Sequence, residues 1–277
     1  MENVVLVDET GCARGTAAKA AVHHARTPLH LAFSTYLFNG TGQFLLTRRA
    51  ESKPTWPGVW TNTCCGHPLP GEPVADSVRR RLRQELGIGA AELVLVLPRF
   101  RYHARMANGV LENEVCPVYA AYSDATPIPD PTEVAEIRWV DWDQFCAAAG
   151  AGRQPVSPWC AMQLPELMAL GPEPLAWASA DTADLPPAAV PPVLSTGSSG
   201  RFRVDTHHRP HHLHSFIHTR GVSDLRASLT FFISPSAGPV RSAGPLGPAR
   251  GPAVRARRPA RLRARGRRLS SRPSACR

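Results

Sequence analysis

Residues 60–88 read WTNTCCGHPLPGEPVADSVRRRLRQELGI, and this stretch joins a loop to an amphipathic helix. The loop contains a thiol, an imidazole and two glycines. Apolar side chains then recur every four residues, at Val74, Val78, Leu82 and Leu86. This period predicts a helix with one buried face, and Gly87 stands where a left-handed helix end needs glycine. Because Arg81 and Glu85 share a neighbouring helix face, the stretch suits a metal–diphosphate site.

The charge of the chain is divided unevenly along its length. Residues 1–180 carry 15 Lys and Arg against 18 Asp and Glu, whereas residues 181–277 carry 17 against 4. The net charge of +10 therefore describes the C-terminal part and argues against nucleic-acid binding by the rest. From residue 172 onward Pro, Ala, Ser, Gly and Arg dominate. We therefore predict a folded domain over 1–171 and a disordered tail over 172–277.

Cysteine usage and the distribution of apolar residues predict the cellular compartment. The seven cysteines are an odd number and follow no disulfide-framework spacing. The first residues lack the basic segment and long apolar core of a secretory signal. No run approaches the ~18 apolar residues of a membrane span. We expect reduced thiols in a cytoplasmic protein without a membrane span, and the sequence leaves the oligomeric state open.

Strands outnumber helices in the predicted domain. Strand-like segments fall at 3–7, 29–38, 43–48, 92–97, 99–105, 110–122 and 136–141. A helical turn or two is expected within 16–27, and helices are expected near 142–149 and 158–170, the last kinked or delayed by Pro165. Strands interspersed with a few helices indicate an α+β domain of two or three layers.

Three histidines and two acids are candidate metal ligands: His23, His30, His67, Glu112 and Glu114. Glu112 and Glu114 are two apart in a predicted strand, so both carboxylates point to one face. Imidazole and carboxylate together suit Mn²⁺, Mg²⁺ or Zn²⁺, and ligand type does not choose among them. A lone histidine is more often a surface residue than a ligand, so spacing by itself does not establish this site.

A second group of candidates is cationic and would bind a diphosphate: Lys19, Arg49, Lys53 and Arg81. Phosphate oxygens need charge-assisted donors and Mg²⁺, which Glu85 would hold. Taken singly, each cation is also compatible with a solvated surface charge. Cys65 lies in a Gly-His-Pro loop, which favours a reactive thiol over a structural one. Trp159 either closes the core or offers its ring face to a cation.

Taken together, these residues resemble the type 1 isopentenyl-diphosphate isomerases of the Nudix superfamily. The matching words are His23-x6-His30-Leu-Ala-Phe-Ser, Arg48-Arg49-Ala, Lys53, Trp56-Pro57-Gly58-Val59-Trp60-Thr-Asn, Cys65-Gly66-His67-Pro68, Arg80-Arg81, Glu85-Leu86-Gly87, Phe100-Arg-Tyr102, Glu112-Asn-Glu114-Val-Cys-Pro and Ser157-Pro158-Trp159. The match covers about residues 3–170. The resemblance implies a Nudix-like mixed sheet flanked by helices.

The Nudix superfamily box reads G-x5-E-x7-R-E-U-x-E-E-x-G-U, where U is aliphatic. The sequence fits it at Gly66, Glu72 and Arg80, but Arg81 and Gln84 stand where the box has acids. A hydrolase of this superfamily needs those acids to hold metals and to activate water. The isomerases share their loss, so this departure favours an isomerase over a Nudix-type diphosphate hydrolase.

The resemblance implies interconversion of isopentenyl and dimethylallyl diphosphate, which feeds isoprenoid biosynthesis. Protonation of the double bond gives a tertiary carbocation, and loss of a different proton gives the product. Two acid/base groups on opposite sides of the substrate are therefore needed. By the resemblance Cys65 and Glu114 are this pair, and Tyr102 assists proton movement near Glu114. Trp159 would offer its ring face to the cation.

The basic tail supports an alternative outside enzyme chemistry. Residues 255–268 hold eight arginines in fourteen positions. Such a segment suits RNA, DNA or an anionic membrane. It lacks interleaved aromatic residues and amphipathic spacing, so its binding would be non-specific and lost at high salt. We expect no specific nucleic-acid partner and favour a poorly selected or misread extension.

Overall fold

A computed structural model describes residues 2–190 of the chain. The predicted tail from residue 191 onward, including its arginine-rich segment, lies outside these residues. The strands are β1 (Asn3–Val7), β2 (Ala13–Ala18), β3 (His30–Leu31), β4 (Phe33–Phe38), β5 (Gln43–Arg49), β6 (Trp60–Thr61), β7 (Cys64–Gly66), β8 (Glu92–Leu97), β9 (Arg101–Arg105), β10 (Leu111–Val115), β11 (Val118–Tyr122) and β12 (Val134–Asp141). The helices are α1 (Lys19–Val22), α2 (Val74–Leu86), α3 (Trp142–Gly150) and α4 (Pro158–Met168), followed by the 3-10 turns η1 (Pro174–Ala176), η2 (Thr182–Asp184) and η3 (Pro187–Ala189).

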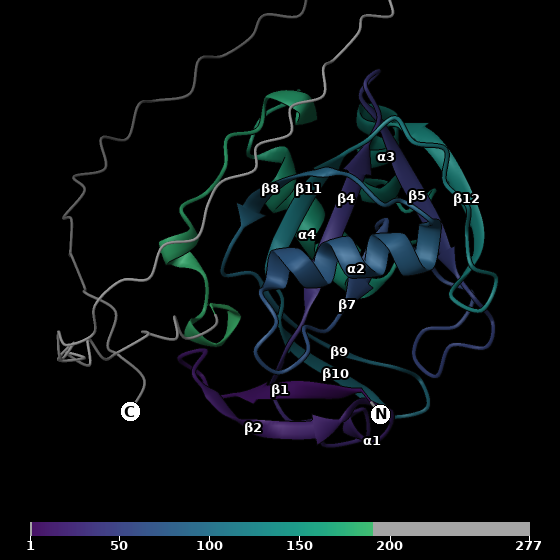
Figure 1. Ribbon diagram of the computed structural model, residues 1–277. Helices are drawn as coiled ribbons and strands as arrows, with labels where there is room; N and C mark the ends of the chain where they lie inside the picture. The colour runs from purple at the N-terminus through teal and green to yellow at the C-terminus, as the bar shows by residue number, and fades with distance from the viewer. Residues whose placement is uncertain (1, 191–277) are drawn as a thin grey trace, which may run out of the picture. The chain divides into compact units, whose positions relative to one another are not determined.

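Two mixed sheets form the framework of the domain. The larger has the strand order β12-β5-β4-β11-β8, with β6 paired to β5 and β7 to β4. The smaller has the order β2-β1-β3-β10-β9. In Figure 1 the strands β1 and β2 lie below the larger sheet. The mixed sheets with few helices confirm the predicted α+β class.

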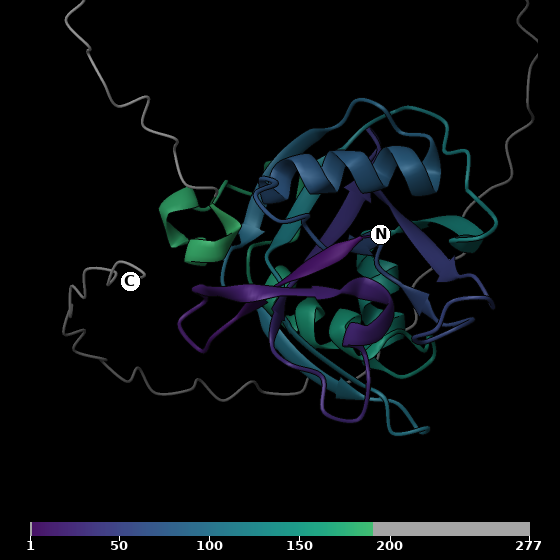
Figure 2. The ribbon, with the colours of Figure 1, turned by 60° about the horizontal axis from the view of Figure 1, so that its bottom comes forward.

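Helices cover both faces of the larger sheet because its central strand β4 is apolar on both faces. Phe33 and Leu37 pack in one cluster with Val78 and the other apolar residues of α2. Tyr36 and Phe38 point the other way, into a cluster with residues of α3 and α4. Figures 1 and 2 show α2 crossing one face, with α3 and α4 on the opposite one. The core therefore consists of two apolar layers with the sheet between them.

Two chain segments run next to each other from the smaller sheet into the larger one. The predicted strands 29–38 and 110–122 are each divided in two, as β3 with β4 and β10 with β11. Pro117 separates β10 from β11, and a proline has no N–H for a strand ladder. Both β3–β10 and β4–β11 pair in parallel. This double crossing brings the side chains of β3 and β10 together at the boundary between the sheets.

The structure confirms a helical turn within residues 16–27 but assigns the first of these residues to a strand. Ala13–Ala18 forms β2, which pairs antiparallel with β1, and α1 has only four residues. Backbone pairing with β1 therefore outweighs the helix preference of the alanines. In α4, Pro165 lies inside the helix, which begins at Pro158 as predicted and ends at Met168.

The compact part of the chain extends beyond the predicted boundary at 171. Trp177 is buried, and its ring centroid lies 5.6 Å from those of both Phe38 and Trp142. Its indole N–H donates to the Gly171 carbonyl at 3.1 Å. The turns η1 to η3 follow, and Ala189 is buried against the α2 cluster. The proline-rich composition concealed this packing, because single buried side chains produce no periodic pattern.

The prediction of a cytoplasmic protein rested on reduced thiols and on the lack of a membrane span. Cys64, Cys65, Cys116, Cys146 and Cys160 are free. Among residues 2–190, no helix has the length and apolarity needed to cross a membrane.

Candidate active site

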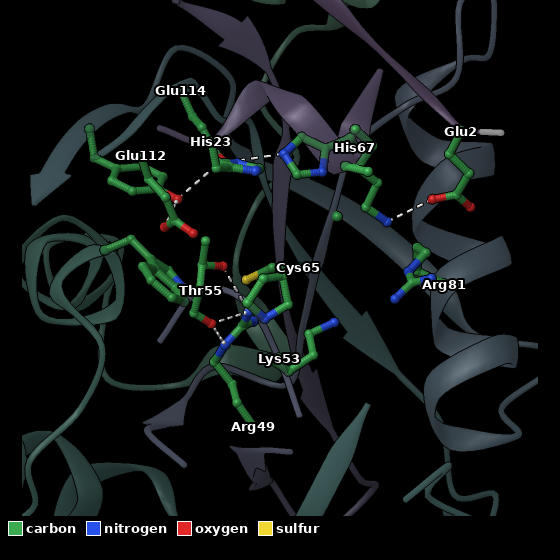
Figure 3. Close-up of a pocket in the computed structure, with 16 residues that line it drawn as sticks. Glu2, His23, Arg49, Lys53, Thr55, Cys65, His67, Arg81, Glu112 and Glu114 are labelled. Atoms are coloured by element: carbon green, nitrogen blue, oxygen red, sulfur yellow. Dashed lines mark hydrogen bonds and ion pairs between the residues drawn. The ribbon is translucent and has the colours of Figure 1, made fainter. Parts of the chain in front are cut away.

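One cavity of about 420 Å³ gathers most of the residues that the sequence singles out. Its walls come from α1, β7, α2, β9, β10, α4 and the segment after β5. The candidates that line it are Lys19, His23, Arg49, Lys53, Cys65, His67, Arg81, Tyr102, Glu112, Glu114 and Trp159. Figure 3 shows the side chains around this cavity. His30 and Glu85 do not line it, and each contacts a residue that does.

Strand pairing brings four of the candidate metal ligands together. His30 in β3 lies opposite Glu114 in β10, His67 follows β7, and His23 ends α1. One ligand atom from each of these four residues lies within 4.8 Å of the others. Glu114 Oε1 is 3.2 Å from Nε2 of His67 and 3.4 Å from Nε2 of His30. The Nε2 atom of His23 is 3.8 Å from the same oxygen.

The chemistry of these four residues fits a divalent metal ion. Nδ1 of His30 lies 2.9 Å from the Pro28 carbonyl, and donation there leaves Nε2 with a lone pair. That Nε2 is only 3.2 Å from Nε2 of His67. Burial lowers the pKa of His67 to about 4, so its ring is neutral at pH 7. Nε2 of His23 is buried without a hydrogen-bond partner. Several lone pairs converging on one point favour a cation there.

Glu112 lies in the same cavity but outside this group of four. The Tyr102 hydroxyl is 3.0 Å from Glu112 Oε2 and 2.8 Å from Glu114 Oε2, so it joins the two carboxyl groups. Burial raises the pKa of Glu112, and the neighbouring Glu114 adds to this rise. Burial also opposes ionisation of Glu114, but the three neighbouring imidazole groups outweigh it and hold its pKa well below the usual value. Both carboxyl groups share one face of β10, as the sequence predicts.

Cys65 faces the cavity from β7, which pairs with β4. Its Cα partner in that pairing is Ser34, whose hydroxyl oxygen is 3.6 Å from the sulfur. The thiol donates to Asn62 Oδ1 at 3.2 Å. Burial raises the pKa of Cys65 to about 11, so the thiol keeps its proton at neutral pH. Cys65 and Glu114 line the same cavity, which the hypothesis of a two-sided acid/base pair requires.

Trp159 forms part of the cavity wall near the start of α4. The Ser157 side chain caps this helix by accepting from the Cys160 N–H. The indole N–H of Trp159 donates to Asn62 Oδ1 at 2.8 Å, and the ring is 2% exposed. The guanidinium carbon of Arg49 is 5.7 Å from the centre of the ring. Trp159 is therefore part of the core and also has a guanidinium group near its ring.

The four cationic candidates line the cavity, and two of them pair with acids that the sequence analysis missed. Lys19 Nζ is 2.7 Å from Glu2, and Lys53 pairs with Glu133. Arg49 donates to the Thr55 carbonyl at 2.9 and 3.1 Å. Figure 3 shows the ion pair of Glu2 and the contacts between Arg49 and Thr55. Glu2 and Glu133 are far from their partners in sequence, and no local motif marks them.

Glu85 is engaged by Arg81. Arg81 donates to Glu85 Oε1 at 2.6 and 2.9 Å, and its guanidinium is 3.2 Å from Glu133. Arg81 also donates to the Gln84 side chain at 3.2 Å. The arginine that replaces an acid of the Nudix box is thus surrounded by acceptors. The predicted i, i+4 proximity of Arg81 and Glu85 is present in α2.

Comparison with known proteins connects this geometry to a family. The NUDIX domain family matches residues 28–160. A protein of Saccharopolyspora erythraea named isopentenyl-diphosphate Delta-isomerase is 58% identical over 190 residues, which cover 69% of this chain and 98% of that protein. The chain belongs to the isopentenyl-diphosphate Delta-isomerase family. Proteins of the same name from Rhizobium rhizogenes and Mycolicibacterium vanbaalenii are 50% and 56% identical, over 90% and 93% of their lengths.

Membership of the isopentenyl-diphosphate Delta-isomerase family confirms the resemblance inferred from the quoted words. The Rhizobium and Mycolicibacterium relatives match 68% and 61% of this chain. The chain has Arg81 and Gln84 at two positions where the Nudix box has acids. In the structure Arg81 occupies that part of α2 and turns its charge toward the cavity.

Proposed function

We propose that this chain interconverts isopentenyl and dimethylallyl diphosphate, with Cys65 and Glu114 as the two acid/base groups. The observation that carries these assignments is the shared cavity, which places a thiol, a carboxylate, a buried indole and four cations around one space. A flat five-carbon substrate between Cys65 and Glu114 would present one face to each group. Because the reaction is reversible, each group acts as an acid in one direction and as a base in the other.

The cationic residues of the cavity would bind the diphosphate. Phosphate oxygens accept strong charge-assisted hydrogen bonds from Lys19, Arg49, Lys53 and Arg81. Lys19 and Lys53 already pair with Glu2 and Glu133, so the phosphate would replace these acids as their partner. In this proposal Mg²⁺ accompanies the diphosphate and is held by Glu85, whose carboxylate lies next to Arg81.

A divalent ion completes the proposed site. His23, His30, His67, Glu112 and Glu114 would hold Mn²⁺, Mg²⁺ or Zn²⁺. When bound, the ion orients the ligating carboxylates and stabilises their ionised forms. The tight group of His23, His30, His67 and Glu114 supports this assignment, and Glu112 would join it by a small side-chain movement.

The proton transfers follow from the chain's own residues. A proton added to the double bond leaves positive charge on the tertiary carbon, and a second proton then leaves the neighbouring carbon on the other face. The Tyr102 hydroxyl joins Glu112 and Glu114 and so can move a proton along this wall. Trp159 offers its ring to the carbocation, an interaction of up to ~2 kcal/mol or more in a dry site. This mechanism requires that water be kept from the carbocation, because water would trap it as an alcohol.

Proton NMR in D₂O tests this function directly. Isopentenyl diphosphate is incubated with the protein and Mg²⁺, and deuterium is expected to enter the allylic product. A parallel sample, with a nucleoside diphosphate derivative in place of isopentenyl diphosphate, is assayed for inorganic phosphate. Release of phosphate from nucleoside diphosphate derivatives, without isomerisation, would favour the Nudix-type hydrolase instead. The cytoplasmic location stays a prediction from the sequence.

A further inference from the structure

Asn62 lies between two residues of the proposed mechanism without reaching the cavity itself. It follows β6 and is fully buried at 0% exposure. The cavity is lined by Cys65 and Trp159, but not by Asn62. Any effect of Asn62 on a reaction in the cavity must therefore pass through the side chains that it contacts.

The amide of Asn62 has a full set of hydrogen bonds. Its Nδ2 donates to the Thr35 carbonyl at 3.1 Å and to the Cys64 carbonyl at 3.0 Å. Its Oδ1 accepts from the Trp159 indole N–H at 2.8 Å and from the Cys65 thiol at 3.2 Å. The Thr61 hydroxyl also donates to Oδ1, at 2.8 Å.

These contacts allow only one orientation of the amide. Two of the partners are backbone carbonyls, which only accept, and the indole N–H only donates. Rotating the amide by half a turn would place Oδ1 against the two carbonyl oxygens of Thr35 and Cys64. It would also place Nδ2 against the indole N–H of Trp159, so that two donors would face each other. The oxygen is therefore held toward Cys65 and Trp159 by partners outside the cavity.

We propose that Asn62 is a positioning residue that aligns the Cys65 thiol and the Trp159 indole through its single side-chain oxygen. Cys65 comes from β7 and Trp159 from α4, and they are 94 positions apart in the sequence. Both groups donate to Oδ1, so the oxygen sets the rotamer of the thiol and the edge of the indole that faces the core. The lone pairs of the sulfur and the face of the indole ring are left for the cavity.

This inference rests on the proposed function and adds a reason for its geometry. Proton transfer requires the sulfur close to the reacting carbon, and cation stabilisation requires the ring face toward the charge. An error of about 1 Å in such an alignment costs on the order of 100-fold in rate. Binding of the diphosphate depends on Lys19, Arg49, Lys53 and Arg81, none of which contacts Asn62. Loss of Asn62 should therefore lower kcat and leave KM nearly unchanged.

The test combines kinetics with NMR of the full chain labelled with ¹⁵N-tryptophan. The chain has six tryptophans, and Trp159→Phe identifies the indole resonance of Trp159 by its loss. In the wild type we expect this resonance to be shifted downfield and protected from exchange. In Asn62→Leu it should move upfield, with kcat reduced on the order of 100-fold and KM within about twofold.

Thr63→Val is the matched control. Thr63 is 1% exposed, lies next to Asn62, and bonds only to the backbone of Leu37 and Leu45 through its hydroxyl. This variant should keep both the Trp159 resonance and kcat. If Asn62→Leu does not fold, Asn62→Asp replaces it, because the carboxylate keeps an acceptor for the indole. We then expect the downfield resonance to persist and KM to stay within about twofold.

Several results would overturn the inference. The first is rapid exchange of the Trp159 indole proton in the wild type. The second is a folded Asn62→Leu protein with normal kcat. The third is an Asn62→Asp protein whose Trp159 indole resonance is that of a free indole. Failure of the proposed function gives a different result. If the wild-type protein has no isomerase activity, the proposed function is wrong and the predicted loss of kcat falls with it. The indole resonance would still show whether Trp159 is bonded to Asn62.

Discussion

At the residue scale, the site depends on buried polar atoms that have few alternative partners. Glu114 is 5% exposed and lies among three imidazoles, and Cys65 donates to a buried amide oxygen. Burial and local hydrogen bonds shift the two groups in opposite directions, so that at pH 7 the thiol is protonated and the carboxylate ionised. Two titratable groups with pKa values moved apart are what acid/base chemistry at neutral pH requires.

Substitution of either acid/base residue should abolish turnover. In Cys65→Ala and Glu114→Gln we expect isomerisation to fall by about 10²–10⁴-fold, because each removes one proton-transfer group. Turnover is measured by NMR and folding by circular dichroism. Cys146→Ala is the control, since Cys146 is another buried free thiol and lies outside the cavity. Normal isomerisation by Cys65→Ala or Glu114→Gln would contradict the assignment.

The reactivity of Cys65 should depend steeply on pH. The thiolate is the form that iodoacetamide alkylates, and burial raises the pKa of Cys65 to about 11. A raised pKa keeps the thiol neutral through pH 7 to 9. The alkylation rate, followed by mass spectrometry of the Cys65 peptide, should therefore rise about tenfold per pH unit as the pH approaches that value. A plateau between pH 8 and 9 would show an ordinary thiol.

At the scale of elements, α2 connects the core to the cavity. Its apolar stripe of Val74, Val78, Leu82 and Leu86 is fully buried against the larger sheet, while Arg81 points to the cavity. The helix ends at Gly87, which has φ 68° and whose N–H donates to the Arg83 carbonyl. A misplaced end of this helix would also move the loop between β11 and β12, since the backbone N–H groups of Ile128 and Asp130 donate to the Leu86 and Glu85 carbonyls.

Gly87→Ala should destabilise the protein. A left-handed backbone costs a residue with a Cβ about 1–2 kcal/mol, and this Cβ would lie 3.2 Å from that of Ile128. The free energy of unfolding should fall by that amount, with Tm lower by roughly 2–8 °C. Gly89→Ala is the matched control, because its Cβ would meet nothing closer than Arg83 Nε at 3.9 Å. Equal Tm values for the two variants would contradict the prediction.

At the scale of the whole molecule, the domain is completed by residues beyond α4. Trp177 packs edge-on against Phe38 and Trp142, and Tyr122 donates to the Pro174 carbonyl at 2.7 Å. Arg99 pairs with Asp184 at 2.9 Å. The segment from η1 to η3 therefore belongs to the compact part, although its composition resembles that of the predicted tail.

Two truncations separate these parts. A chain ending at residue 190 should keep the Tm and the isomerase rate, because the residues of the site and their contacts all lie before that point. A chain ending at residue 171 should lose about 3–5 kcal/mol or more of stability, since it lacks the buried Trp177. Thermal unfolding and NMR turnover measure both effects. A lower isomerase rate after removal of 191–277 would show that the tail takes part in catalysis.

Much of this protein was determined by its sequence alone. The period of the apolar residues predicted α2 and its end at Gly87, because helix geometry is local. The i, i+2 spacing of Glu112 and Glu114 predicted their common face, because side chains alternate between the two faces of a strand. The quoted words around Cys65 and His67 were sufficient to identify the family, since they combine rare residue types at fixed spacings.

Other features were decided only by the tertiary structure. The register of β3 with β10 brings His30 next to Glu114, and the packing of α4 brings Trp159 to Asn62. The partners Glu2 and Glu133, the division of two strands between two sheets, and the burial of Trp177 also have no local signature. The physical reason is that these contacts join residues far apart in the chain, where pairing and packing, and not local backbone preference, determine which side chains meet.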